Sequence, residues 1–275
     1  VNPTFRRYAE KIIRTLMAHV QHHPAIIGWQ LDNETKHYDN IGRHMQEGFV
    51  RSLQEKYPDL DQLNNDFGLD YWSNRIDSWQ DFPPVENTIN ASLACTFSRY
   101  QRQQVTEYLA WQAEIVREYA QPHQFVTHNF DFEWRGYSYG VQPRVDHFAA
   151  AQTLDIAGVD IYHPSQKHLT GREIAFGGAI TRSLKQGKNY FVLETQAQGF
   201  AQWTPYPGQL RLQAFSHVAS GAAMVSYWHW HSIHNAFETY WKGLLSHDFS
   251  RNATWQEATT IGADFARLSP QLAEL

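Results

Sequence analysis

Residues 26–34 have the sequence IIGWQLDNE, an apolar run that ends in polar side chains. A short, nearly continuous apolar run is typical of a parallel strand covered on both faces. Asn33 and Glu34 follow the run at the point where a strand gives way to a loop. A bare Asn-Glu pair is also common at helix caps and turns, but here it follows a strand that carries Trp29. The stretch therefore predicts a buried strand that delivers two polar side chains at its carboxyl end.

The chain contains five such apolar or β-branched runs, and the stretches between them have helical patterns. The runs are residues 25–31, 124–129, 154–161, 189–193 and 222–227, and the helical stretches are 5–22, 45–57, 92–119, 180–185 and 209–220. The last four runs recur about every 30 to 35 residues, the length of one βα unit. The sequence therefore predicts an α/β fold with parallel strands.

We expect this fold to be a (β/α)8 TIM barrel, with the chain covering roughly its last five βα units. The three other strands are expected before Val1, in a longer protein of which this chain is a fragment. Residues 1–275 are predicted to form one catalytic domain, the C-terminal part of the barrel. A long insertion, approximately residues 40–90, follows the first strand on the face where loops build sites.

Composition favours some classes of function and excludes others. Aromatic residues make up 15% of the 275 residues, a share that suits sugar-binding clefts as well as cores. The net charge is −5 and the sequence has no basic cluster, which argues against a nucleic-acid partner. Because Cys95 is the single cysteine, neither a disulfide within the chain nor a Cys-rich zinc site is possible. No apolar run reaches eighteen residues and the sequence shows no signal peptide, so we expect no membrane segment and a cytoplasmic location. We also expect no cofactor.

A second glutamate repeats the design of the first strand. Glu194 follows the apolar run Tyr190-Phe191-Val192-Leu193, three strands after the strand that ends at Glu34. Three steps around an eight-stranded ring place two strand ends nearly across its mouth. Two carboxyl groups about 5–5.5 Å apart are the acid/base and the nucleophile of a retaining glycosidase. The pair of Glu34 and Glu194 therefore predicts glycoside hydrolysis. Asn33, beside Glu34, is suited to hold a sugar 2-hydroxyl during this reaction.

The sequence resembles the catalytic domain of glycoside hydrolase family 42 β-galactosidases over essentially its whole length. The likeness rests on GWQLDNE at residues 28–34, on FGLDYW at 67–72 through Ser78-Trp79, and on 222–248 with its YWHW and ETYWKGLL. It implies an exo-acting retaining β-galactosidase, with Glu34 as acid/base on barrel strand four and Glu194 as nucleophile on strand seven. It also implies a galactoside or oligosaccharide substrate and a homotrimer.

The resemblance assigns further substrate-binding residues. Tyr162 matches a tyrosine near the nucleophile, Trp203 a tryptophan that lines the sugar site, and Glu238 a glutamate that binds galactose hydroxyls. Trp241 stands where many members have a histidine, which implies stacking in place of a polar contact. The arginine that members use near the substrate would precede Val1, and the clustered cysteines that bind zinc in some members are not present.

Three alternatives remain open from the sequence. The same two-glutamate arrangement serves other barrel glycosidases of the β-mannanase or β-glucanase type. A truncated, non-catalytic carbohydrate-binding barrel would share the aromatic residues. His229, His231 and His234 could form a metal site, but no acidic third ligand lies at a favourable spacing, and we predict no metal.

Overall fold

The computed structural model describes residues 2–132, 141–163, 169–198, 204–239 and 241–272, which divide into two compact units. Unit 1 consists of residues 1–124 and 143–153, and unit 2 of residues 125–142 and 154–275. Trp203 lies outside the described residues.

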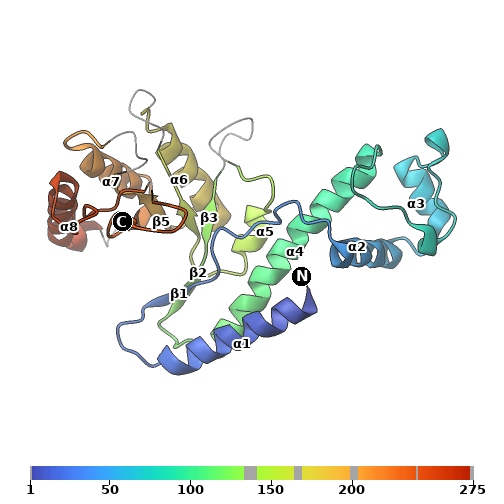
Figure 1. The fold of residues 1–275 in the computed structure, drawn as a ribbon, viewed down its shortest axis with the longest axis horizontal. Helices are drawn as coiled ribbons and strands as arrows, with labels where there is room; N and C mark the ends of the chain where they lie inside the picture. The colour runs from blue at the N-terminus through green and yellow to red at the C-terminus, as the bar shows by residue number, and fades with distance from the viewer. Residues whose placement is uncertain (1, 133–140, 164–168, 199–203, 240, 273–275) are drawn as a thin grey trace. The chain divides into compact units, whose positions relative to one another are not determined.

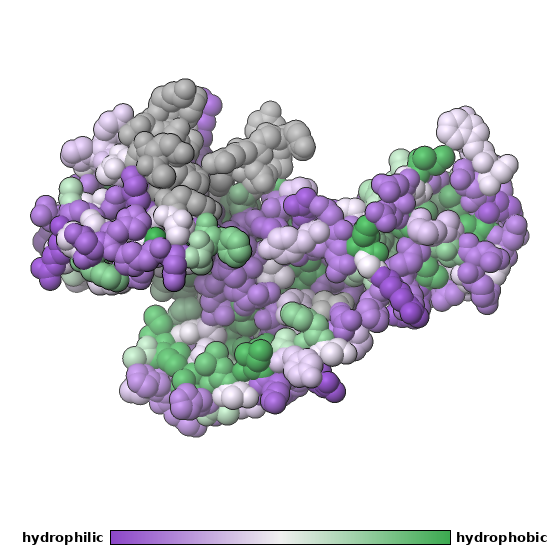
Figure 2. Space-filling view, in the orientation of Figure 1, coloured by the Kyte–Doolittle hydropathy of each residue, from purple (hydrophilic) through white to green (hydrophobic). Residues whose placement is uncertain are grey.

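Unit 1 is built around two helices that pack against each other, α1 (Pro3–Val20) and α4 (Ala91–Arg117). Both predicted helices are confirmed. The side chain of Asn2 accepts hydrogen bonds from the first turn of α1, and Asn90 does the same for α4, so each helix begins at a capping residue. The outer face of α1 is apolar and exposed, with Ile12 68% accessible, and it forms part of the apolar surface in Figure 2.

The insertion also belongs to unit 1 and has a hydrophobic core of its own. It contains α2 (Arg43–Lys56), α3 (Leu60–Phe67) and two 3-10 helices, η1 (Tyr71–Ser73) and η2 (Trp79–Asp81) (Figure 1). Phe49 and Leu63 are fully buried in this core. The buried Asn64 amide donates to Ile76 O at 2.8 Å and accepts from Ile76 N at 2.9 Å, which fixes the loop after α3.

Strand β1 (Gly28–Gln30) confirms the first predicted strand, although the run is less buried than expected. Leu31 is buried, whereas Ile27 is 59% exposed because no described segment packs over it. The indole Nε1 of Trp29 donates to Gln124 Oε1 at 2.8 Å, and Gln124 Nε2 donates to Ile26 O at 3.0 Å. The remaining helix of unit 1 is the short α5 (His147–Ala151).

Unit 2 contains a four-stranded parallel sheet whose strands neighbour one another in sequence order. The strands are β3 (Asn129–Asp131), β4 (Gly158–Asp160), β5 (Tyr190–Gln196) and β6 (Ala222–Trp228). Such an order results when every connection steps to the adjacent strand in one direction, as in a (β/α)8 barrel. Because the strands are parallel, their carboxyl ends share one edge of the sheet.

Helices α6 (Arg172–Leu184) and α7 (Gln209–Ala219) connect these strands, and α8 (Ala253–Leu272) packs against α7 (Figure 1). Helix α6 packs on β4 and β5, and α7 packs on β6. The core between these layers contains Val159, Ile161 and Val192, all fully buried. Helix α6 begins eight residues before the predicted helix at 180–185.

The predicted strand at 124–129 was wrong in one respect, because the structure divides it at His128. Strand β2 (Phe125–Thr127) ends before this residue and β3 begins after it. Side-chain hydrogen bonds hold β2 to the segment before β4: Val126 N donates to the Asp155 carboxylate at 2.7 Å, and Thr127 Oγ1 donates to Ile156 O at 2.8 Å. The His128 ring is fully buried, with its centroid 4.9 Å from that of Phe130.

Candidate active site

Glu194 lies near the carboxyl end of β5, and hydrogen bonds hold both of its carboxylate oxygens. The hydroxyl of Tyr162, two residues past the end of β4, donates to Oε2 at 2.8 Å. The amide of Asn129, the first residue of β3, donates to Oε1 at 3.2 Å. The three adjacent strands thus each supply one group: β3 supplies Asn129, the segment after β4 supplies Tyr162, and β5 supplies Glu194 itself. Such contacts stabilise the ionised form of a carboxylate and fix its orientation.

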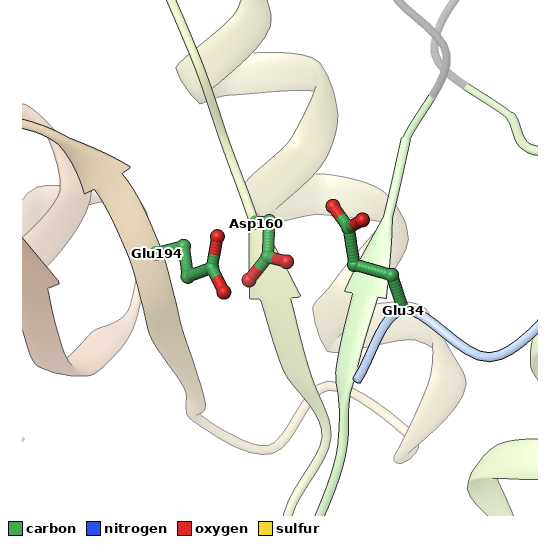
Figure 3. A group of neighbouring side chains, drawn as sticks. All are labelled: Glu34, Asp160 and Glu194. Carbon is green, nitrogen blue, oxygen red and sulfur yellow. The ribbon is translucent and has the colours of Figure 1, made fainter. Parts of the chain in front are cut away.

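A second carboxylate, that of Asp160, belongs to the same group of side chains. Asp160 is the last residue of β4 and is almost completely buried. Its Oδ2 accepts a hydrogen bond from Asn129 Nδ2 at 2.8 Å, so the Asn129 amide bridges Asp160 and Glu194. Figure 3 shows these two carboxyl groups on the neighbouring strands β4 and β5.

The backbone is irregular where Glu194 leaves the sheet. Val159 pairs with Val192, but the next residue of β4, Asp160, pairs with Glu194. The register on the β6 side also shifts between Val192 and Thr195. Leu193 is therefore an additional residue in β5, and bulges of this kind re-aim the side chains that follow them.

Glu34 lies in unit 1, in a loop with a strained backbone. Its φ is +43°, and Asp32, Tyr38 and Asp39 have φ values of +45°, +48° and +54°. Residues other than glycine seldom adopt this region, and clusters of such residues occur at functional sites. The ammonium of Lys36 lies 3.9 Å from Glu34 Oε2, so a cation stands beside this carboxylate.

A cavity of about 740 Å³ opens beside this loop within unit 1. Its polar lining includes Asn33, Lys36, His37, Asn40, Gln101 and Tyr108. Burial lowers the pKa of His37, an effect that the Asp39 carboxylate opposes, so the imidazole is neutral at pH 7. The volume and the mixed lining are typical of small-molecule sites.

The structure places the other predicted site residues as follows. Tyr162 and Trp241 lie in unit 2 with ring centroids 5.4 Å apart, and Trp241 is buried. Tyr162 thus contacts the ring of Trp241 and also donates a hydrogen bond to Glu194. Glu238 is exposed. Asn33 lines the cavity of unit 1.

Sequence reasoning missed Asn129 and Asp160. From the sequence, Asn129 is only the last residue of the predicted strand 124–129, and Asp160 lies within the apolar run 154–161. An acidic residue within an apolar strand is a signal that could have identified Asp160, because buried carboxylates require partners.

The three histidines considered for a metal remain near one another in unit 2. Ring centroids of His229 and His231 are 5.8 Å apart, and those of His231 and His234 are 5.6 Å apart. Nδ1 of His231 is within 2.8 Å of Ser232 O, a hydrogen bond that occupies one potential ligand atom. Among the described residues these imidazoles do not converge as ligands of a single ion.

None of the helices in the described part of the chain has the length and apolar character that crossing a membrane requires.

Comparison with known proteins gives a consistent result. A β-galactosidase of Thermus thermophilus is 30% identical over 294 residues, an alignment that covers 98% of this chain and 44% of that protein. Beta-galactosidase BgaA of Clostridium cellulovorans is 25% identical over 280 residues, with 98% and 41% covered. The chain thus spans about two fifths of the length of these relatives.

Solved structures show the same fold. A catalytic mutant of Gan42B, a GH42 β-galactosidase from G. stearothermophilus, superposes with a TM-score of 0.88 at 23% identity, covering 98% of this chain and 41% of that one. The β-galactosidase of Halorubrum lacusprofundi gives 0.84 at 24% identity, covering 96% and 42%. These neighbours are TIM barrels, which confirms the predicted (β/α)8 fold class.

The sequence model of glycoside hydrolase family 42, described as Beta-galactosidase, matches residues 1–268. This match covers nearly the whole chain and agrees with the relatives and with the fold. The chain belongs to glycoside hydrolase family 42.

Proposed function

We propose that this chain is part of the catalytic (β/α)8 domain of a retaining β-galactosidase. The enzyme would hydrolyse terminal non-reducing β-D-galactosides by double displacement, with Glu194 as nucleophile and Glu34 as acid/base. The single observation that carries the proposal is the family match, which includes both glutamates within residues 1–268. The hydrogen bonds to both oxygens of Glu194 support its role.

The nucleophile must be ionised and correctly oriented when the substrate arrives. The donors on Tyr162 and Asn129 supply both conditions, because each stabilises the carboxylate and restricts its rotation. In the first step an oxygen of Glu194 bonds to the anomeric carbon while the glycosidic C–O bond breaks. The proton of Glu34 passes to the leaving oxygen, and a covalent galactosyl-enzyme ester remains.

In the second step Glu34 removes a proton from a water molecule, whose oxygen attacks the anomeric carbon. The ester bond to Glu194 breaks, galactose leaves with its β configuration retained, and both glutamates return to their initial protonation states. Asn33, beside Glu34 in the sequence, is proposed to hold the sugar 2-hydroxyl, a hydrogen bond that strengthens in the transition state.

The other residues are proposed to bind the galactose ring. Trp241 and Tyr162 form an aromatic pair next to the nucleophile, and a flat ring offers a stacking surface for the apolar face of a sugar. Glu238 would accept hydrogen bonds from galactose hydroxyls, and Trp203 would line the sugar site. The family likeness extends the proposal to a homotrimer, which analytical ultracentrifugation of the full-length protein would test.

Substrate specificity distinguishes this proposal from its alternatives. The full-length protein should hydrolyse 4-nitrophenyl β-D-galactoside with a higher kcat/KM than the corresponding glucoside or mannoside. An equal or greater preference for mannoside or glucoside would favour a β-mannanase or β-glucanase type of enzyme. Binding of galactose without hydrolysis of any glycoside would favour a carbohydrate-binding protein.

A further inference from the structure

A cluster of buried polar side chains lies behind the carboxyl ends of β4 and β5. The side chain of His163 is completely buried, and both of its ring nitrogens have partners. Nδ1 is 2.8 Å from Oε1 of Glu173, in the first turn of α6, and Nε2 is 3.3 Å from Oγ1 of Thr195. The order of carboxylate, imidazole and hydroxyl resembles a hydrolytic triad, but Thr195 is only 3% exposed. A substrate cannot reach its hydroxyl, so the chain of hydrogen bonds must act through its neighbours.

Gln196 holds the backbone of the same histidine. His163 N donates to Gln196 Oε1 at 2.8 Å, and Gln196 Nε2 donates to His163 O at 2.9 Å. His163 directly follows Tyr162, while Thr195 and Gln196 directly follow Glu194. The cluster therefore joins the residue after Tyr162 to the two residues after Glu194. Gln196 binds the backbone of His163, and Thr195 binds its ring.

The charges in the cluster favour one arrangement of hydrogen atoms. Burial raises the pKa of Glu173 more than any single contact lowers it, but the hydrogen bonds from His163, from the backbone and from Thr170, together with the charge of His163, bring the pKa below its usual value. The ionised carboxylate can only accept, so Nδ1 of His163 carries a hydrogen. A second titratable group, His217 of α7, also faces the ring, with ring centroids 5.5 Å apart. Burial lowers the pKa of His217 to about 3, so it stays neutral.

The strand that carries Glu194 needs such a restraint. The additional residue Leu193 interrupts the ladder on both sides of β5, so regular pairing alone does not fix the direction of the Glu194 side chain. The cluster holds the chain directly after this irregularity, through Thr195 and Gln196.

We propose that Glu173, His163 and Gln196 are positioning residues that keep Glu194 aligned with Tyr162 for attack on the anomeric carbon. This inference rests on the proposed function of Glu194 as nucleophile. Glu173 fixes the tautomer of His163, His163 orients the Thr195 hydroxyl, and Gln196 locks the backbone of β5 to the end of β4. A displacement of about 1 Å at a nucleophile can cost on the order of 100-fold in rate.

Two substitutions in the full-length protein test the proposal. Glu173→Gln keeps the size of the side chain but removes its charge, so His163 can adopt either tautomer. Gln196→Met keeps the volume but removes both hydrogen bonds to His163. The matched control is Thr181→Val, which removes a buried hydrogen bond to Gly177 O from the same helix, α6, away from the cluster.

The readout is the rate at which 2,4-dinitrophenyl 2-deoxy-2-fluoro-β-D-galactoside traps the nucleophile covalently, measured beside the melting temperature. We expect Glu173→Gln and Gln196→Met to slow trapping by about 10- to 100-fold, with KM for 4-nitrophenyl β-D-galactoside changed far less than kcat. The acidic limb of their kcat/KM profile should move to higher pH, because a misaligned Tyr162 stabilises the carboxylate less. Thr181→Val should trap at the wild-type rate.

The inference is overturned if Glu173→Gln and Gln196→Met trap the reagent at the wild-type rate, or if all three variants slow in proportion to their lost stability. If one of the two variants fails to fold, the other decides the question by the same criteria. Failure of the proposed function has a different signature, because the wild-type protein would then hydrolyse no galactoside. That result would overturn both proposals together, whereas an active wild type with unaffected variants overturns this one alone.

Discussion

Tyr162 donates its hydroxyl hydrogen to Oε2 of Glu194 at 2.8 Å, and the two residues lie at the carboxyl ends of adjacent parallel strands. Asn129 holds the other oxygen of the same carboxylate from the strand beyond. A carboxylate that accepts a hydrogen bond at each oxygen keeps its charge and loses its freedom to rotate. Both properties are required of a nucleophile that attacks a single carbon atom.

Removal of the Tyr162 hydroxyl should slow catalysis without unfolding the protein. A hydrogen bond to a charged group contributes about 1.5–3 kcal/mol, so Tyr162→Phe should lower kcat/KM for 4-nitrophenyl β-D-galactoside by about 10- to 100-fold. Tyr206→Phe is the matched control, because Tyr206 is exposed in the same unit. Equal activity of Tyr162→Phe and wild type would show that this hydrogen bond has no part in the reaction.

A third carboxylate in the site should make stability depend on pH in a defined direction. In Asn129→Asp the new side chain lies beside Asp160 and Glu194, so burial and like charges raise its pKa in the folded state. A carboxyl group with a raised folded pKa is tolerated at low pH and becomes unfavourable as pH rises through that pKa. Urea unfolding should therefore show a loss of stability relative to wild type that grows between about pH 4 and pH 7. A loss that is constant over this range contradicts the prediction.

His217 should weaken the fold in acid. Its imidazole is fully buried, and its nitrogens have no hydrogen-bond partner within the described ranges. Because the folded pKa of about 3 is below the unfolded value, the stability present above about pH 6.5 is lost as pH falls toward the folded pKa. The slope is about 1.4 kcal/mol per pH unit for one proton. In urea unfolding, the free energy of unfolding of His217→Leu should depend less on pH between pH 6 and pH 4 than that of the wild type. An unchanged slope would exclude His217 as the source of the acid sensitivity.

Gly158 should tolerate no side chain, because a Cβ atom there would overlap Cδ1 of Leu193 and lie 2.7 Å from His128 O. Forcing a methyl group into such a contact costs about 1–3 kcal/mol, so Gly158→Ala should lower the free energy of unfolding. Because the displaced Leu193 directly precedes Glu194, Gly158→Ala should also lower kcat. Gly262→Ala is the control: nothing lies within 4 Å of a Cβ there, and alanine in helix α8 should stabilise by about 0.5–1 kcal/mol. Similar stability of the two variants would contradict the packing argument.

The sequence predicted those parts of the fold that local patterns encode. An apolar run that ends in glutamate predicted β5 and Glu194, and the periodicity of apolar residues predicted α1 and α4. Helix α8 was not predicted, since Gly262 and Pro270 interrupt its pattern. The contribution of Asn129 and Asp160 could not be predicted from local sequence, because it depends on which strands become neighbours and in which register.

The roles of Glu34 and Glu194 remain a prediction that chemical rescue tests most directly. In the full-length protein, Glu34→Ala should still form the galactosyl-enzyme from 2,4-dinitrophenyl β-D-galactoside, whose leaving group needs no acid, and added azide should then release β-galactosyl azide. Glu194→Ala should form no covalent intermediate and, with azide, give only the α-azide by direct displacement. Nuclear magnetic resonance of the anomeric proton distinguishes the two products. The predicted result is a β product from the first variant and no β product from the second; an α product from Glu34→Ala, or undiminished hydrolysis by Glu194→Ala, would contradict the assignment.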